Sequence, residues 1–193
     1  SLPETQRAAC GTSRLSQVYR VFTTAKLRTV LPIYPSPDVQ KAWTGNSDVL
    51  LLQKTALFSR IVDQFSHVHK GRGLRGARIL DYGCGWGRIL RQMLYFSDPD
   101  HLFGVDPWHK SIEQCEASRV PGNIFKVDYR PVALPVEIRN IDLSCAFSIF
   151  THIGEENVRE VLRCVRAVTA PKGLFVATIR PIELLADTKT DPW

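Results

Sequence analysis

The segment Asp81-Tyr82-Gly83-Cys84-Gly85-Trp86-Gly87 places a carboxylate before three glycines that alternate with larger residues. Glycine lets a backbone turn sharply and approach a bound molecule closely. The first N–H groups of a helix that follows such a loop have no partner within the helix. We therefore predict that this loop joins a strand to a helix and holds a ligand with Asp81, Gly83, Cys84, Gly85 and Gly87.

The residue after the loop bears on the kind of nucleotide-derived cofactor. A dinucleotide-binding loop has the spacing G-x-G-x-x-G, which would put its third glycine at position 88. That position is Arg88, and the carboxylate of Asp81 would repel a pyrophosphate. The residues of the loop therefore disfavour a nicotinamide dinucleotide as its ligand. A nicotinamide-dependent oxidoreductase remains the alternative interpretation.

A second carboxylate, Asp106, lies in the segment Gly104-Val105-Asp106-Pro107-Trp108, one helix and one strand beyond the glycine loop. A carboxylate at a strand end can accept hydrogen bonds from both hydroxyls of a ribose. Asp106 thus indicates a nucleoside without separating the two cofactor classes. Pro107 or Trp108 is a candidate to pack against the adenine, with ordinary core packing as the alternative for Trp108.

The acidic residue followed by G-x-G-x-G resembles motif I of class I S-adenosylmethionine-dependent methyltransferases, and the resemblance covers about residues 40–181. It implies that the loop wraps the amino-acid part of S-adenosylmethionine and that Asp81 contacts its ammonium group. Arg88 would reach the carboxylate of the cofactor, with a surface salt bridge as the alternative. An upstream Trp-x-Gly segment helps to close the site in related enzymes, which makes Trp43, Gly45 and Asn46 cofactor candidates.

Two later segments extend the resemblance. Asp128, followed by Tyr129, matches the acidic residue that often meets the adenine amino group, and a loop or cap role is the alternative. Residues 146–153 are similar to the segment after the fourth strand of small-molecule methyltransferases, which implies that Phe147 and Ser148 line the sulfur end of the cofactor. His152 is a candidate general base because an imidazole accepts a proton near neutral pH. Its alternative role is a local hydrogen bond within the loop.

The expected acceptor is a small molecule rather than a nucleic acid. Methyltransferases of base amino groups carry Asn/Asp-Pro-Pro-aromatic after the fourth strand, and this chain lacks that motif. The net charge of +6 permits an acidic partner. Its basic residues are scattered, however, and the densest cluster, at residues 70–75, is interleaved with glycines as in a solvated linker.

The positions of these residues depend on alternating strands and helices. Apolar runs predict strands at residues 78–82, 102–106, 124–128, 141–147 and 174–179, the last after a turn at 171–173. Helical periodicity predicts helices at 48 to about 70, 88–96, 111–118 and 155–168, and a loose helix at 14–31. This alternation predicts an α/β fold of the Rossmann-like, doubly wound type, with a mostly parallel sheet and helices on both faces. The strand ends then share one edge.

We divide the chain into an N-terminal helical segment, residues 1–75, and an α/β core, residues 76–193. About fourteen residues follow the fifth strand, which is too few for the last strands of the family's seven-stranded sheet, so the sheet is expected to be reduced or incomplete. No apolar run is long enough for a membrane span, and the N-terminus lacks signal-peptide features. Five widely spaced cysteines predict neither a metal site nor disulfides, and favour the cytoplasm.

Overall fold

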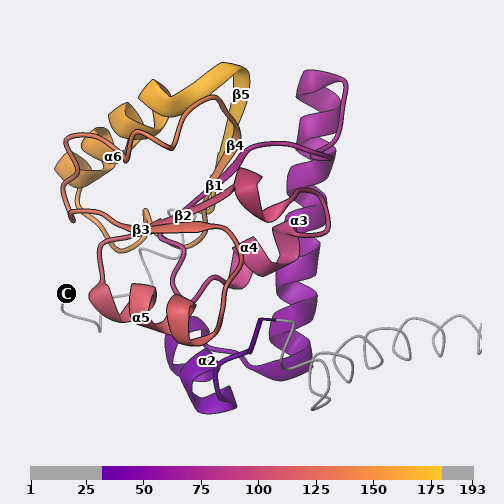
Figure 1. Cartoon of the computed structure of the whole chain (residues 1–193), viewed down its shortest axis with the longest axis vertical. Coiled ribbons are helices and arrows are strands. Elements are labelled where there is room, and N and C mark those ends of the chain that lie inside the picture. Colours follow the sequence, from indigo (N-terminus) through magenta and orange to yellow (C-terminus); the bar gives the residue numbers. More distant parts are fainter. Residues whose placement is uncertain (1–31, 180–193) are drawn as a thin grey trace, which may run out of the picture.

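The computed structural model describes residues 32–179, and its elements are shown in Figure 1. The helix that the sequence predicts at 14–31 and the residues after 179 lie outside the described part. Within residues 32–179, no helix combines the length and apolar content that a membrane crossing needs.

Five parallel strands form the sheet, in the order β3-β2-β1-β4-β5. Their bounds are Ile79–Tyr82 for β1, Leu102–Asp106 for β2, Asn123–Lys126 for β3, Ile141–Ala146 for β4 and Thr169–Ala177 for β5. The strand order reverses between β1 and β4, which pair side by side. The predicted doubly wound fold is confirmed, and its topological switch point lies where such folds bind ligands.

Helices cover both faces of this sheet. The helices α3 (Asp48–Lys70), α4 (Arg88–Met93) and α5 (His109–Ala117) contribute to a core on one face, and α6 (Glu155–Val168) packs on the other. In β1, Ile79 belongs to the first core and Leu80 to the second, and both side chains are fully buried. A strand buried on both faces needs a continuous apolar run, which explains why β1 and β2 are recognisable in the sequence.

The helix α2 (Pro37–Thr44) is not among the predicted elements, because the prolines of this region suggest a break. Ser36 is its N-cap, with Oγ accepting from the N–H of Val39 at 3.4 Å, and Pro37 takes the first helical position. Proline fits that position well, since its missing N–H would have no partner there. Pro37 therefore starts a helix rather than ending one.

Other element ends differ from the predicted ones. The helix α4 ends at Met93 instead of residue 96, and a 3-10 helix, η1 (Pro99–His101), precedes β2. The strand β5 begins at Thr169 rather than after the turn predicted at residues 171–173. These residues lie within β5, where its register with β4 shifts and Lys172 adopts a φ of 61°. A bulge at this point accommodates residues that sequence patterns indicate as a turn.

The N-terminal helices share the core of the sheet. Phe58 and Val62 of α3 lie in the same buried cluster as Leu90 of α4 and Leu143 of β4. The division of the chain at residue 75 remains a prediction.

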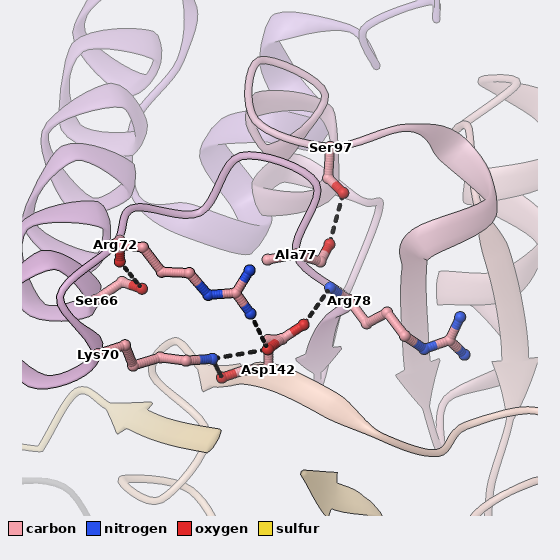
Figure 2. Close-up of polar contacts among 7 residues, drawn as sticks. All are labelled: Ser66, Lys70, Arg72, Ala77, Arg78, Ser97 and Asp142. Carbon is pink, nitrogen blue, oxygen red and sulfur yellow. Dashed lines mark hydrogen bonds and ion pairs between the residues drawn. The ribbon is translucent and has the colours of Figure 1, made fainter. Parts of the chain in front are cut away.

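Asp142 of β4 ties the far end of α3 to the edge of the sheet opposite the switch point (Figure 2). Its Oδ1 accepts from Lys70 Nζ at 2.8 Å and from Arg72 Nη2 at 3.0 Å, and its Oδ2 accepts from the backbone N–H of Arg78 at 3.1 Å. Partial burial alone would raise the pKa of Asp142, but the bonds from Lys70 and Arg78 outweigh it and lower the pKa. The ionised carboxylate is thus the form that stabilises the fold.

We expect Asp142→Asn to lower the free energy of unfolding by about 2 kcal/mol at neutral pH, because it removes charge-assisted hydrogen bonds. A depressed pKa contributes stability that is present above the ordinary value and is lost as pH falls through the native value. The difference between wild type and variant, measured by urea denaturation, should therefore shrink below about pH 4. The control is Glu155→Gln, which removes an exposed ion pair with Arg159 and should change little. An Asp142 effect that is the same at acidic and neutral pH would contradict this account.

Candidate functional site

A cavity of about 720 Å³ opens at the switch point, where the loops after β1, β2 and β4 meet residues of α2 and α3. It brings together many of the predicted site residues, which come from four separate stretches of the chain. Those that line it are Trp43, Asn46, Asp81, Gly83, Cys84, Gly85, Arg88, Asp106, Trp108, Phe147, Ser148 and His152.

The glycine loop is held against β2 by its own backbone. The N–H groups of Gly83 and Cys84 both donate to the carbonyl oxygen of Val105, at 2.8 and 3.0 Å. Gly83 has a φ of 74°, and a Cβ at this position would overlap the side chain of Ile149. A glycine is required here by both conformation and space, and the loop after β4 packs closely over it.

Asp106 joins the loops after β1 and β2. Its Oδ2 accepts from the N–H of Gly85 and its Oδ1 from the N–H of Trp108, both at 2.9 Å. Burial raises the pKa of this carboxyl, while hydrogen bonds from the N–H groups of Trp108 and Gly85 and from the side chain of Ser111 oppose the rise. A carboxylate offers about four lone-pair sites, so Asp106 can still accept a further bond from a donor in the cavity.

Asp81 is almost fully buried, with 1% of its surface exposed, and is incompletely satisfied. Its Oδ1 accepts a weak bond from Cys145 Sγ at 3.7 Å, and its Oδ2 has no hydrogen-bond partner among the described residues. Burial raises the pKa of Asp81 to about 7, although the charge of Arg88 acts in the opposite direction. A buried carboxylate oxygen without a donor, at the wall of a cavity, calls for a donor from a ligand.

Arg88 lies where the sequence places it, at the start of α4, but its side chain is held inside the protein. Its Nη1 donates to Thr55 Oγ1 of α3 at 3.1 Å, and its guanidinium lies 4.4 Å from the ring centroid of Phe147. Burial lowers the pKa of Arg88, and Asp81 raises it. The guanidinium therefore offsets part of the negative charge of Asp81 without an exposed salt bridge.

Two tryptophans lie together at the cavity. The rings of Trp43 from α2 and Trp108 from the loop after β2 are 4.7 Å apart between centroids, and Lys110 Nζ lies 5.6 Å from the ring of Trp108. Trp108 remains 42% exposed. The two rings, tilted by 39° to each other, provide an aromatic wall to the cavity that Asp106 also lines.

Five predicted cofactor residues do not line the cavity. Gly45 caps the end of α2, Gly87 precedes α4 beside Val120, and Pro107 lies between Asp106 and Trp108 in the chain. Asp128 lines a separate hollow with Lys126 and Leu134, and Tyr129 is 66% exposed. Contacts of these residues with a cofactor remain predictions.

Comparisons with known proteins give this arrangement a family. A family model described as "Methyltransferase domain" matches residues 79–173, from β1 to the bulge of β5. Residues 79–173 form a class I methyltransferase domain. The resemblance predicted from the acidic residue and the G-x-G-x-G spacing is confirmed, and S-adenosylmethionine is the cofactor that this family supports.

Two curated relatives align with part of this domain. The chain is 28% identical to the cyclopropane-fatty-acyl-phospholipid synthase of Escherichia coli over 122 residues, which are 61% of this chain and 30% of that protein. It is 30% identical to the ubiquinone biosynthesis O-methyltransferase of Methylocella silvestris over 112 residues, which are 56% of this chain and 42% of that protein. The chain thus spans less than half the length of both relatives.

Solved methyltransferases share the fold of the domain. An amino pentose methyltransferase from Micromonospora echinaspora superposes with a TM-score of 0.56 at 18% identity, covering 75% of this chain and 56% of that one. A TehB-like methyltransferase from Corynebacterium glutamicum gives 0.52 at 21% identity, covering 72% and 66%. At such identities the likeness concerns the fold alone.

The helical wall of the methyltransferase cavity was not predicted from the sequence. Ala42, Thr44, Leu51 and Lys54, all from α2 and α3, line it. The prediction of α3 as a helix contained a usable signal, because Leu51 and Lys54 are three residues apart and so lie on neighbouring parts of one face. However, the sequence predicted neither α2 nor the packing of α3 against α4. The pattern of residues in α3 therefore could not show that this face of the helix lines the cavity.

Ionisation of the buried Asp81 should lower the free energy of unfolding of the ligand-free methyltransferase domain. A carboxyl whose native pKa is raised contributes stability that is present below its unfolded value and is lost as pH rises through the native value. We therefore expect Asp81→Asn to be more stable than wild type above about pH 7, by on the order of a few kcal/mol, and the difference to vanish toward about pH 4.

Thermal and urea unfolding of the ligand-free chain at a series of pH values measures this difference. The matched control is Asp98→Asn, since Asp98 is exposed and precedes η1, away from the cavity. A wild type that is more stable than Asp81→Asn throughout this range would show that Asp81 is satisfied within the fold.

Proposed function

We propose that this chain transfers a methyl group from S-adenosylmethionine to an oxygen or nitrogen nucleophile of a small-molecule acceptor, by direct in-line displacement. The single observation that carries the proposal is the pair of buried carboxylates, Asp81 and Asp106, that border one cavity at the switch point of the sheet. The match to the methyltransferase family model supports the same function. The names of the two curated relatives, an O-methyltransferase and a cyclopropane-fatty-acyl-phospholipid synthase, are consistent with it.

The residues of the cavity fit the chemical groups of this cofactor. The unpartnered Oδ2 of Asp81 suits an ammonium group, which is both a donor and a cation. The remaining acceptor capacity of Asp106 suits a ribose hydroxyl, and the wall formed by Trp43 and Trp108 suits the adenine ring. In this assignment Arg88 lies near the carboxylate of the methionine part.

The sulfonium group supplies an electrophilic methyl whose transfer needs no covalent step on the protein. The task of the chain is to bind both reactants, to orient the nucleophile and to keep water from the reacting atoms, which accounts for most of the rate gain in such reactions. Phe147 and Ser148 line the cavity next to Asp81, and their loop also carries His152. We assign His152 the role of accepting the proton of an attacking hydroxyl or amine.

A domain that binds the cofactor without catalysis is the second candidate function. Turnover with a panel of acceptors separates the two, whereas cofactor binding does not. The nicotinamide-dependent alternative lacks support from the family match. We place the activity in the cytoplasm on the basis of the cysteine pattern.

Cofactor binding can be tested by thermal shift. S-adenosylmethionine and S-adenosylhomocysteine at about 100 times their Kd should raise the melting temperature by roughly 5–10 °C, and NAD should not. Asp106→Ala should abolish the shift, and Asp98→Asn should leave it unchanged. A shift with NAD alone would overturn the cofactor assignment. In the same assay, Asp128→Ala tests the predicted contact of Asp128 with the adenine.

The affinity for S-adenosylhomocysteine should depend on the ionisation of Asp81. Because the native pKa of this carboxyl is about 7, a bound ammonium stabilises the ionised form and affinity should fall as pH drops below about 7. We expect roughly tenfold weaker binding per pH unit in the acidic limit, and a flat profile for Asp81→Asn. Calorimetric titration measures both, and parallel profiles for the two proteins would argue against an ion pair with Asp81.

His152→Ala should leave the affinity for S-adenosylhomocysteine within about twofold and lower turnover by roughly 100-fold or more, as for loss of a general base. A second variant, His152→Gln, retains a polar side chain and controls for a local hydrogen bond. Normal turnover by His152→Ala would exclude the base, and recovery by His152→Gln would point to the structural role.

A further inference from the structure

One face of α3 carries a row of apolar side chains that the described residues leave uncovered. Leu50, Leu57, Ile61, Phe65 and Val68 are 52%, 57%, 38%, 44% and 77% exposed, and we call them the α3 stripe. Their spacing of three, four or seven residues places them along one side of the helix, over a length of about 27 Å. An uncovered apolar stretch of this size marks a surface that binds something.

The α3 stripe is continuous with the cavity. Leu51, which follows Leu50, lines the cavity, and so does Lys54, which lies between Leu50 and Leu57 on the stripe. The neighbouring side of the same helix is buried, with Phe58 in edge contact with Phe147 at 4.9 Å between ring centroids. The helix α3 thus starts at the cavity, next to α2, and runs along the sheet toward the opposite edge (Figure 1).

Lys54 is the cation that interrupts this apolar wall. Its side chain is exposed at the cavity, and no ion pair among residues 32–179 includes it. The carboxylates that line the cavity, Asp81 and Asp106, are both buried on the side of the sheet. An ammonium with apolar neighbours and no carboxylate partner favours an anionic ligand group.

We propose that the methyl acceptor is an anionic amphiphile, with a carboxylate or phosphate held by Lys54 and an apolar chain laid along the α3 stripe. The identification as acceptor rests on the function proposed above, whereas the binding of an anionic amphiphile follows from α3 alone. The anionic group is the anchor, and a separate oxygen or nitrogen is the nucleophile. An apolar chain lying on Leu57 and Ile61 stabilises the complex in proportion to the apolar area that it removes from water.

The test is calorimetric titration of the full chain, in the presence of S-adenosylhomocysteine, with dodecanoate, dodecyl phosphate and dodecyltrimethylammonium below their micelle concentrations and with dodecanol below its solubility limit. We expect the two anions to bind at least about tenfold more tightly than the alcohol, because the charge-assisted bond to Lys54 is worth at least that factor. The cation should not bind measurably, and acetate should bind far more weakly than dodecanoate.

Two pairs of variants separate the charge from the apolar surface. Lys54→Glu should weaken the anions about tenfold or more and leave dodecanol nearly unchanged, whereas Lys126→Glu, at the exposed last residue of β3, should change neither. Leu57→Ser should weaken every dodecyl ligand, and its control is Val132→Ser, which alters an even more exposed apolar side chain away from α3.

Several outcomes would overturn the inference. Absence of binding would mean that another part of the chain or a second copy covers the stripe, and equal binding of alcohol and anions would remove the role of Lys54. Binding to phosphatidylglycerol vesicles without binding of the dispersed anions would assign the stripe to a membrane surface. A weaker S-adenosylhomocysteine affinity in Lys54→Glu would place Lys54 at the cofactor.

The same titrations distinguish this inference from the proposed function. If wild type fails to bind S-adenosylhomocysteine but binds dodecanoate in a Lys54-dependent manner, the methyltransferase function falls and the amphiphile site stands. If S-adenosylhomocysteine binds and the anions do not, the cofactor assignment stands and the acceptor assignment falls.

Discussion

Much of the structure around the site depends on keeping two carboxylates out of water at the carboxyl edge of a parallel sheet. Burying a carboxylate is unfavourable unless donors or opposite charges compensate. Asp106 is compensated within the fold by two backbone N–H groups and by the side chain of Ser111. Asp81 is compensated only in part, by a thiol and by the through-space charge of Arg88. Asp106 is therefore stabilised by the fold itself, whereas full compensation of the charge on Asp81 requires a donor from a ligand.

The same constraint explains the position of α3. Arg88 can remain buried because Thr55 of α3 accepts one of its hydrogen bonds and Phe147 provides an aromatic face. Both Thr55 and Phe58, the partner of Phe147, project from the buried side of α3. A helix that precedes the methyltransferase domain in the sequence therefore completes the electrostatic environment of the glycine loop that begins the domain.

The sequence was informative where a local pattern determines the structure. The glycine loop, the carboxylates at the ends of β1 and β2 and the doubly buried strands all have a local signature, and α6 was predicted with its observed ends, Glu155 and Val168. The start of β5 and the helix α2 depended on context, since a bulge and a helix N-terminus use the same prolines and glycines as a turn. The wall formed by Leu51 and Lys54 required tertiary packing, which no short pattern contains.

The two ends of α3 are held in different ways. Its C-terminal end is joined to β4 through Lys70 and Asp142, at the edge of the sheet opposite the cavity, while its N-terminal turns form the outer wall of the cavity. Substitutions near Leu50 and Lys54 can therefore alter the shape and charge of that wall while the distant attachment keeps the helix in register. This separation gives the scaffold evolvability: ligand selectivity can drift at one end of a single helix while the glycine loop and its carboxylates stay as they are.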